Sequence, residues 1–324
     1  MKAILPREPG PPEVLELRDV EVPSPGPNEV LIKVAAAGIN RADLLQRQGH
    51  YQPLPGVSPI PGLEVSGRVA GVGAEVSNWA IDDTCVALLT GGGYAEYVAA
   101  PAGQVVPPPL GVELLAAAGV IEVAATVYSN VELIGLGDGD LFLVHGGAGG
   151  VGSFAIQYAK SLGATVITTA GSNDKLNYCR SIGADHAVSY RGDWPAAVRG
   201  IAADGVHMIL DNMGAKYLAD HVQLLATDGA LVIIGLQGGR SAMLDLAAVM
   251  GKRALVTANS LRPRPVEAKA AICRGLVQNV WPLIADDTIK QPPLTVYPLA
   301  EAAAAHARLE SGENIGKIIL SVGR

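Results

Sequence analysis

The pattern of apolar and polar residues changes character near residue 121. Before that point, short alternating or apolar stretches, such as 29–34, 65–73 and 94–98, are separated by Gly and Pro, which is typical of a compact β domain. After it, apolar runs of strand length alternate with segments of helical spacing. This alternation predicts βαβ units and a parallel sheet covered on both faces. The predicted fold class is therefore α/β, with a doubly wound parallel sheet beside a mostly-β domain.

The second half of the chain supplies the strands of that sheet. Its predicted strands are 141–144, 165–169, 187–189, 208–211, 230–234 and 254–257. Beyond them, a helix around 265–283 leads to the breaker Pro292-Pro293, and a strand at 317–322 ends the pattern. Because the chain returns to β character there, we expect its end to rejoin the first domain. The expected division is 1–121, 122–265 and 266–324, with the last part returning to the first.

A glycine-rich turn follows the first of these strands. Gly147, Gly149 and Gly152 satisfy G-x-G-x-x-G between an apolar run and a stretch of helical spacing. In dinucleotide-binding folds the first glycine allows a tight turn, the second lets backbone approach a pyrophosphate, and the third lets helix and strand pack closely. Free N–H groups and the helix dipole favour an anion at that point. The turn is therefore predicted to bind a dinucleotide through Gly147, Ala148, Gly149, Gly150, Val151 and Gly152.

The tip of the next strand bears on which dinucleotide binds. NAD-binding folds carry an Asp or Glu there for the ribose 2′-hydroxyl, but this chain has Gly171 and Ser172, and Lys175 opens the following helix. A small residue, a hydroxyl and an ammonium would receive a 2′-phosphate that a carboxylate would repel. Asp174 suits the helix start through the dipole. The tip favours NADPH. Tyr190 is either a cofactor contact or a half-buried tyrosine at a strand end.

Composition narrows the class without naming a function. The 324 residues are 49% hydrophobic and 17% charged, which describes a compact protein long enough for two domains. A net charge of −7 argues against nucleic acid as a partner. Three separated cysteines without C-x-x-C favour a reducing compartment. With no signal peptide after Met1 and no apolar run near the roughly 20 residues that span a bilayer, we expect a cytoplasmic protein without membrane contact.

Six stretches, in this order over essentially the whole chain, together resemble one family. They are Gly38–Tyr51, Gly62–Gly67, Ala148–Gly152, Thr169–Ser172 with Lys175, Asn259–Arg264 and Asn314–Leu320. The chain resembles the zinc-free medium-chain dehydrogenase/reductase family, and within it the NADPH:quinone oxidoreductases of the quinone-reductase-like branch near zeta-crystallin. The resemblance implies a GroES-like β domain, formed by both ends of the chain, around a Rossmann domain. It also implies that the nicotinamide lies in the cleft between them.

The resemblance assigns roles to single residues. It implies that Asn40, Asp43 and Tyr51 line the substrate side of the cleft. Besides the glycine-rich turn, it implies cofactor contacts for Thr126, Gly171, Ser172, Lys175, Tyr190, Asn212, Gly235, Gln237, Ser260, Leu261, Arg262 and Lys317. One departure concerns the hinge. Relatives often have Pro-Glu-Ala-Trp where this chain has Ile121–Ala124, and the loss of the aromatic residue bears on the size of the substrate.

Zinc ligands are missing where zinc-dependent relatives of this fold carry them. Those enzymes place a Cys at the position of Asn40 and a His at that of Leu63, and their structural zinc needs four close cysteines. Only Cys85 lies near that region, so we expect no metal. The histidines are dispersed, and even His145 beside the glycine-rich turn is expected to be structural. No G-x-S-x-G supports a serine hydrolase.

A reductase without a metal must polarise its acceptor through hydrogen bonds. That requirement suits quinones and conjugated enones better than simple ketones. We expect hydride transfer from NADPH to a quinone oriented by Asn40 and Tyr51, with Asp43 fixing these groups from behind. Helix capping is the alternative role for Asn40 and Asp43. The alternative functions are an NADPH-dependent alkenal or enone reductase and a non-catalytic NADPH-binding protein. The unprotected apolar edge strand near 254–257 predicts a homodimer.

Overall fold

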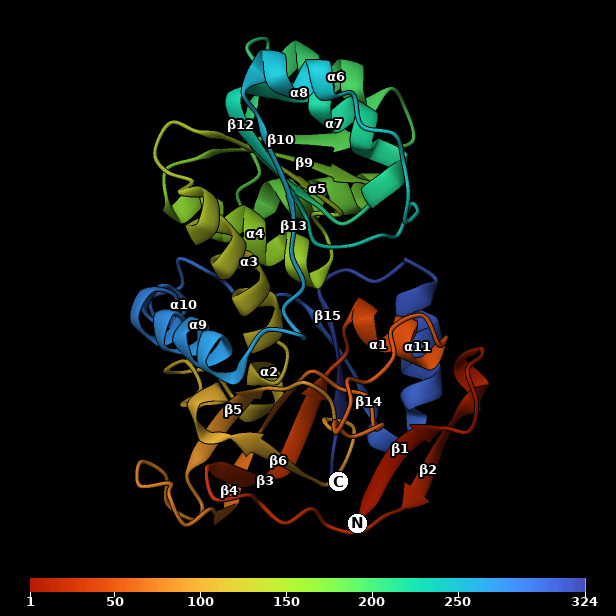
Figure 1. The fold of residues 1–324 in the computed structure, drawn as a ribbon, viewed down its shortest axis with the longest axis vertical. Coiled ribbons are helices and arrows are strands. Elements are labelled where there is room, and N and C mark those ends of the chain that lie inside the picture. Colours follow the sequence, from red (N-terminus) through yellow and green to blue (C-terminus); the bar gives the residue numbers. More distant parts are fainter. Residues whose placement is uncertain (324) are drawn as a thin grey trace. The chain divides into compact units, whose positions relative to one another are not determined.

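The computed structural model describes residues 1–323, which form two compact units (Figure 1). The first unit contains residues 1–125, 261–287 and 291 onwards, so both ends of the chain belong to it. The second unit contains residues 126–260 and 288–290. The boundaries expected from the sequence, 121 and 265, lie close to these divisions at 125 and 261.

The first unit is built on a mixed sheet in the order β14-β15-β3-β4-β5-β7, with β6 paired to β3, and a separate hairpin of β1 and β2. All of these pairs are antiparallel except β14 with β15. The strands are β1 (Lys2–Pro6), β2 (Leu15–Asp19), β3 (Glu29–Gly38), β4 (Glu64–Val72), β5 (Thr84–Leu88), β6 (Tyr97–Pro101), β7 (Val105–Val106), β14 (Leu294–Pro298) and β15 (Lys317–Ser321). Since β15 pairs with β3, the C-terminal strand completes the N-terminal sheet, as expected.

Helices of the first unit cover this sheet and its edges. They are α1 (Arg41–Arg47), α2 (Leu114–Ala117), α9 (Val266–Asn279), α10 (Trp281–Ala285) and α11 (Ala302–Glu310), with 3₁₀ turns at Pro12–Val14, Ala102–Gln104 and Leu299–Glu301. Helix α3 (Ile121–Ile134) begins in the first unit and continues into the second.

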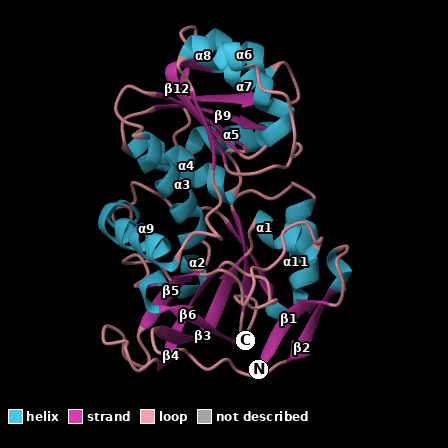
Figure 2. Cartoon of the chain, in the orientation of Figure 1, coloured by secondary structure: helices cyan, strands magenta, loops and turns pink. Residues whose placement is uncertain are grey.

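The second unit is a six-stranded, wholly parallel sheet in the order β10-β9-β8-β11-β12-β13. Its strands are β8 (Leu141–His145), β9 (Thr165–Ala170), β10 (His186–Ser189), β11 (Val206–Asp211), β12 (Leu225–Ile233) and β13 (Leu255–Ala258). Figure 2 shows helices on both faces of the sheet. These helices are α4 (Gly150–Ser161), α5 (Asn173–Ser181), α6 (Trp194–Ile201), α7 (Leu218–Leu224) and α8 (Leu246–Lys252), with a 3₁₀ turn at Gly214–Tyr217.

This strand order places the switch point of the sheet between β8 and β11. Numbered from β8, the order is the 3-2-1-4-5-6 arrangement that binds dinucleotides at the carboxyl ends of the strands around the switch point. The six strands predicted for this sheet are therefore all present, and the predicted α/β class is confirmed.

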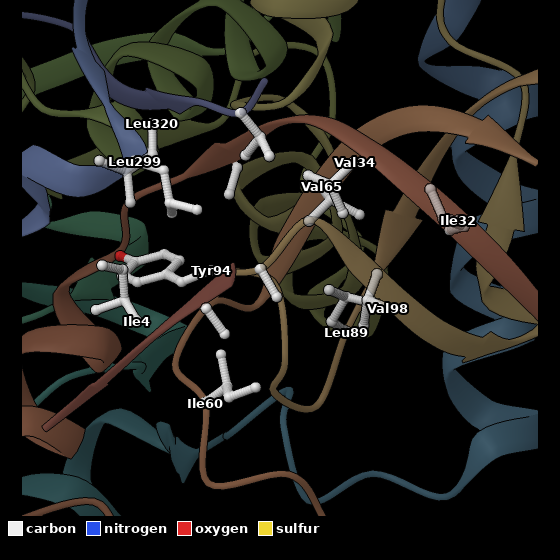
Figure 3. Packing of buried hydrophobic residues seen from close by; sticks show 14 of the residues in the cluster. Ile4, Ile32, Val34, Ile60, Val65, Leu89, Tyr94, Val98, Leu299 and Leu320 are labelled. Atoms are coloured by element: carbon white, nitrogen blue, oxygen red, sulfur yellow. The ribbon is translucent and has the colours of Figure 1, made fainter. Parts of the chain in front are cut away.

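Each unit has its own apolar core. In the first, Ile32 and Val34 of β3 and Val65 of β4 alternate inward, as the period of a strand requires (Figure 3). The aromatic ring of Tyr94 packs into the same core beside Ile4. The second core lies between the parallel sheet and α6 and α7, where the side chains of Val198, Val206 and Leu231 are completely buried.

Several local predictions were wrong in their bounds; the strand predicted at 230–234, for example, is β12, which begins at Leu225. The strand predicted at 94–98 is β6, Tyr97–Pro101, because Tyr94 turns into the core and Ala95 forms only an isolated bridge to Ala3. The helix predicted over 265–283 is two helices, broken at Val280 because Pro282 begins a new first turn. Helix α5 begins at Asn173 rather than Lys175, with Ser172 as its N-cap. Within residues 1–323, no helix combines the length and apolarity needed to cross a membrane.

Candidate active site

The glycine-rich turn of the second unit has the geometry of a phosphate cradle. Helix α4 begins at Gly150 with Gly149 as its N-cap, so the free N–H groups of its first turn point out of the turn. A Cβ on Gly152 would overlap the carbonyl of Gly146 and lie 2.7 Å from Gly147 Cα. A Cβ on Gly147 would overlap the hydroxyl of Thr168. Gly147 and Gly152 are thus required by the fold itself.

Gly149 is different, because the protein alone does not require a glycine there. Its φ is −87°, which any residue adopts, and the one atom close to a Cβ would be the carbonyl oxygen of Gly146 at 3.5 Å. A side chain at this position would fill the space in front of the helix N-terminus, where an anion is favoured. The free space above Gly149 therefore fits a phosphate-bearing ligand.

The tip of β9 carries a second polar site. Ser172 caps α5, and its Oγ accepts the N–H of Lys175 at 3.4 Å. The phenol of Tyr190, which is 44% exposed, lies directly over Gly171, where any side chain would overlap the hydroxyl. No carboxylate occupies the tip itself; Asp174 is exposed in the first turn of α5. Gly171, Ser172, the N–H of Lys175 and the phenol of Tyr190 lie together at this tip, and the 2′-phosphate site stays a prediction.

The end of β11 lies against the glycine-rich turn that follows β8. Asn212 Nδ2 donates to the carbonyl of His145 at 3.2 Å, and Gln237 N–H donates to the carbonyl of Asn212 at 3.2 Å. A Cβ on Gly235 would come within 2.8 Å of that same carbonyl. Asn212 Oδ1 is buried and accepts no hydrogen bond from residues 1–323. The predicted contacts Asn212, Gly235 and Gln237 therefore form one group beside the glycine-rich turn.

In the first unit, Asn40 is part of a buried polar group. Lys317 Nζ lies 2.7 Å from Asn40 Oδ1 and 2.7 Å from Glu64 Oε1, and Asn40 Nδ2 donates to Glu64 Oε1 at 2.9 Å. Glu64 Oε2 accepts the N–H of Glu122 at 3.0 Å. We call Asn40, Glu64 and Lys317 the Asn40 cluster. Lys317 is 4% exposed and Glu64 is fully buried, so the charges are paired away from bulk water.

Two glycines make room for this ion pair. A Cβ on Gly38 would overlap the carboxylate of Glu64, and a Cβ on Gly119 would lie 2.7 Å from Lys317 Cγ. The ammonium of Lys317 is bonded to Asn40 and Glu64, and the cofactor contact that the resemblance implies for Lys317 stays a prediction.

Asp43 lies behind Asn40 and does not face outward. Its Oδ2 accepts the N–H of Asn40 at 2.8 Å and the hydroxyl of Tyr94 at 3.0 Å, and its Oδ1 accepts the N–H of Gly62 at 3.0 Å. Tyr94 in turn lies 3.2 Å from Nε2 of the buried His306. Burial raises the pKa of Asp43 to about 6. Asp43 therefore acts through Asn40, as the capping carboxylate of α1.

Tyr51 is held by Arg262. The guanidinium carbon lies 4.9 Å from the centre of the Tyr51 ring, Nε donates to the carbonyl of Thr90 at 2.7 Å, and Nη2 donates to Gln46 Oε1 at 2.9 Å. Arg262 is 3% exposed. Lys269 donates to the Thr90 hydroxyl at 2.6 Å. Arg262 thus supports the loop that carries Tyr51. The cofactor contact predicted for Arg262 stays a prediction.

Glu122, at the start of α3, is the other unusual acid of this unit. Burial, and then the negative charge of Glu64, raise the pKa of Glu122 to about 8. Of the remaining predicted residues, Thr126 on α3 accepts Asn130 Nδ2 at 2.8 Å through its carbonyl, Ser260 is exposed, and Leu261 is half-buried.

Sequence reasoning missed Glu64, Tyr94, Glu122 and His306. Glu64 stood inside a quoted motif, next to Leu63, and its position at the start of an apolar strand was a usable signal because a carboxylate there must find partners. Tyr94 and His306 had no such signal, since their contact joins segments more than 200 residues apart.

Within residues 1–323, one group of three His, Cys, Asp or Glu side chains has ligand atoms close enough to suggest a metal site. It is His145, Asp211 and His221 of the second unit, all buried. The Asn40 cluster contains no such group, and Asn40 itself presents an amide between an ammonium and a carboxylate.

Comparison with known proteins agrees with both units. Residues 26–110 match the alcohol dehydrogenase GroES-like domain, and residues 150–272 match the zinc-binding dehydrogenase model. The chain is 32% identical to a quinone oxidoreductase of Pseudomonas aeruginosa over 96% of each protein. It is also 33% identical, over 98% of its length, to a mycocerosic acid synthase-like polyketide synthase of Mycobacterium tuberculosis, of which it spans only 15%.

A solved structure gives the same result in three dimensions. The quinone oxidoreductase of Escherichia coli, solved with NADPH, matches with a TM-score of 0.90 and 28% identity over 99% of this chain and 100% of that one. The expected pairing of a GroES-like domain with a Rossmann domain is thereby confirmed. The chain belongs to the medium-chain dehydrogenase/reductase family of oxidoreductases, together with the quinone oxidoreductases.

Proposed function

We propose that the protein is an NADPH-dependent quinone reductase that works without zinc. The observation that carries the proposal is the Asn40 cluster, in which the Lys317 ammonium donates to Asn40 Oδ1 at 2.7 Å and Asn40 Nδ2 donates to Glu64 Oε1 at 2.9 Å, at the position for which the resemblance implies a zinc ligand in zinc-dependent enzymes. Donors of this kind stabilise charge on a developing oxyanion without a Lewis acid. Quinones suit such a site because their reduced form delocalises the charge.

The fit of NADPH rests on the residues of the second unit. The open space at Gly149 and the N-terminus of α4 accommodate a pyrophosphate. Ser172, Lys175 and the phenol of Tyr190 offer two hydroxyls and an ammonium to a 2′-phosphate. The relative from Escherichia coli was solved with NADPH and shares this fold.

In the proposed reaction, quinone, NADPH and one proton give hydroquinone and NADP⁺. When bound, NADPH supplies the hydride. Asn40 Nδ2, which uses one of its two hydrogens on Glu64, and the ammonium of Lys317 hydrogen-bond the acceptor oxygen. Tyr51, backed by Arg262, orients the quinone ring. Asp43 positions Asn40 by accepting its backbone N–H.

The activity is tested in a steady-state assay with NADPH and a panel of small ortho- and para-quinones, run against a panel of 2-alkenals. Turnover of quinones well above that of alkenals is the expected result. Preference for the alkenals would identify an enone reductase. Tight NADPH binding without turnover of either panel would identify a non-catalytic binding protein.

Cofactor choice has its own test at the tip of β9. Lys175→Ala removes the ammonium and is expected to lower NADPH affinity about ten-fold, a loss of about 1.4 kcal/mol, while leaving NADH affinity nearly unchanged. Arg180→Ala, on the exposed side of the same helix, is the matched control. Equal losses for the two cofactors would contradict the assignment of Lys175 to the 2′-phosphate.

We also propose that the protein forms a homodimer through β13. This strand is the edge of the parallel sheet, and apolar side chains beside it are exposed: Leu246 is 65%, Met250 77% and Leu255 50% exposed. An apolar, unpaired edge favours pairing with a second copy. Leu255→Lys is expected to shift the mass measured by light scattering from two chains to one. A monomeric mass for the unmodified protein would refute the proposal.

A further inference from the structure

The second unit contains a fully buried row of polar side chains that the proposed reaction does not use. Thr169 Oγ1 lies 2.9 Å from His145 Nδ1, His145 Nε2 lies 2.7 Å from His221 Nε2, and His221 Nδ1 lies 3.7 Å from Asp211 Oδ2. We call these four residues the histidine chain. All are at most 2% exposed, and the rings of Trp194 and Tyr217 pack around His145, with centroids at 4.8 and 5.1 Å.

The geometry is that of a chain and not of a metal site. A tetrahedral ion needs one atom from each ligand at about 2.0–2.2 Å, converging on one point. Here the two ring nitrogens of His221 face different partners, Nε2 toward His145 and Nδ1 toward Asp211. The 2.7 Å between the two Nε2 atoms is a hydrogen-bond distance. Two rings in that contact cannot both turn the same nitrogens to an ion between them.

One arrangement of protons satisfies the two hydrogen bonds of the histidine chain, while His221 Nδ1 makes only an electrostatic contact with Asp211, at 3.7 Å, and has no hydrogen-bond partner within residues 1–323. Burial lowers the pKa of His221 to about 3 and that of His145 well below its usual value, so both rings are neutral. His221 then carries its proton on Nδ1, facing the carboxylate of Asp211, and its bare Nε2 accepts from His145 Nε2–H. The bare Nδ1 of His145 accepts the hydroxyl proton of Thr169. The reverse order would direct the lone pair of His221 Nδ1 at the Asp211 carboxylate, which electrostatics disfavours.

The histidine chain is joined, through its strand residues, to the loops of the proposed cofactor site. His145 is the last residue of β8, immediately before the glycine-rich turn. The Thr169 carbonyl accepts the N–H groups of Gly146 and Gly147, both at 3.1 Å. Asp211 ends β11, and its carboxylate accepts the N–H groups of Met213 and Gly214 at 2.7 and 2.8 Å.

These three strand ends surround the switch point of the sheet. His221 reaches these strand ends from α7: its Nε2 is hydrogen-bonded to His145 at 2.7 Å, and its Nδ1 faces the Asp211 carboxylate at 3.7 Å, beyond hydrogen-bond distance. Removal of the His221 ring would leave His145 Nε2–H buried without an acceptor, which costs free energy. The loops that follow β8 and β11 would have to move to give His145 a new partner.

We propose that His221 is a positioning residue for NADPH binding, acting through His145 and Asp211 on the loops at 146–152 and 212–214. It touches no ligand itself. The inference rests on the proposed NADPH site but not on the choice of quinone as substrate.

Two variants of His221 and one control test the proposal through NADPH fluorescence titration. His221→Leu is expected to raise the Kd for NADPH about ten-fold or more, with the KM for quinone at saturating NADPH unchanged. His221→Gln is expected to stay within about three-fold of the unmodified protein, because an amide can accept from His145 and donate toward Asp211. Val222→Ala, at a 2% exposed position on the same helix, should lower thermal stability without changing the Kd.

A spectroscopic measurement on the ligand-free protein reads the protons directly. Selective ¹⁵N labelling of the six histidines should show His221 as the Nδ1–H tautomer and His145 as the Nε2–H tautomer. The opposite tautomers would overturn the proposed chain. So would stoichiometric zinc that His221→Leu loses, or a Kd that His221→Leu and Val222→Ala raise equally.

The outcomes separate this inference from the proposed function. NADPH binding that depends on His221, without turnover of quinones, supports the inference and refutes the substrate. Quinone turnover with an NADPH Kd that His221→Leu leaves unchanged refutes the inference and supports the function. A protein that binds neither NADPH nor NADH refutes both.

Discussion

The buried ion pair of Lys317 and Glu64 allows a quantitative test of how the Asn40 cluster is held together. Both side chains are at most 4% exposed, and 2.7 Å separates Nζ from Oε1. In Lys317→Met the carboxylate keeps two neutral donors, Asn40 Nδ2 and the N–H of Glu122, but no compensating charge. Removing one partner of a buried pair costs about 3–5 kcal/mol. The same range is expected for Glu64→Gln, which leaves a buried ammonium.

The double variant distinguishes charge pairing from mere packing. Lys317→Met with Glu64→Gln leaves no unpaired charge, so it should lose less than the sum of the single losses by about 2 kcal/mol or more. Urea unfolding measures each free energy. With a typical slope of about 2–3 kcal/mol/M, a single substitution should move the urea midpoint by roughly 1–2.5 M.

The tryptophans permit the measurement on one unit. Trp79 and Trp281 belong to the first unit and Trp194 to the second. In a Trp194→Phe background, indole fluorescence therefore reports unfolding of the unit that contains the ion pair. Single losses that add to the double loss within about 0.5 kcal/mol would refute the reasoning, because the two charges would then be energetically independent.

Three further predictions follow from the same contacts. Gly149→Ala should weaken NADPH binding at least ten-fold with little change in melting temperature, whereas Gly152→Ala, whose Cβ overlaps a carbonyl, should cost stability; equal stability losses would contradict this. Because the folded-state pKa of Asp43, about 6, lies above the usual value near 3.9, its contribution to the free energy of unfolding is fully present below about pH 4. That contribution, roughly 3 kcal/mol, is lost as pH rises through 6, a slope that Asp43→Asn should abolish in urea titrations. Arg262→Lys loses the paired guanidinium hydrogen bonds to Thr90 and Gln46, so it should lower the free energy of unfolding by about 2–3 kcal/mol and raise the KM for quinone. An unchanged KM would show that Arg262 does not position Tyr51 for the substrate.

The sequence predicted the parallel sheet well and the β unit poorly, for a physical reason. Strands such as Leu141–His145 are buried on both faces, so they read as continuous apolar runs bounded by glycine. In the first unit, β5 and β7 are short. Strand β14 begins directly after Pro292-Pro293, and because prolines are typical of turns, the pattern there does not indicate a strand. Their register depends on neighbours distant in sequence.

The candidate site was predictable to the extent that backbone motifs define it. The glycine pattern carries its own geometry, so the turn and the tip of β9 could be named from local sequence. The partners of Asn40 could not. Lys317 reaches it across 277 residues, and its place in the resemblance gave a cofactor contact and not an ion pair with Glu64. Side-chain pairing of this kind is a property of tertiary packing.

The packing of Tyr190 on Gly171 limits how this protein could exchange one cofactor for another. An acidic residue at the strand tip is the usual route to NADH, but any side chain at Gly171 overlaps the phenol of Tyr190. A side chain at Gly171 therefore requires the ring of Tyr190, which is 44% exposed, to move away from the strand tip. That movement would take the phenol away from the proposed 2′-phosphate site. The two positions are thus coupled, because a change at Gly171 also changes the contact that Tyr190 can make with the cofactor.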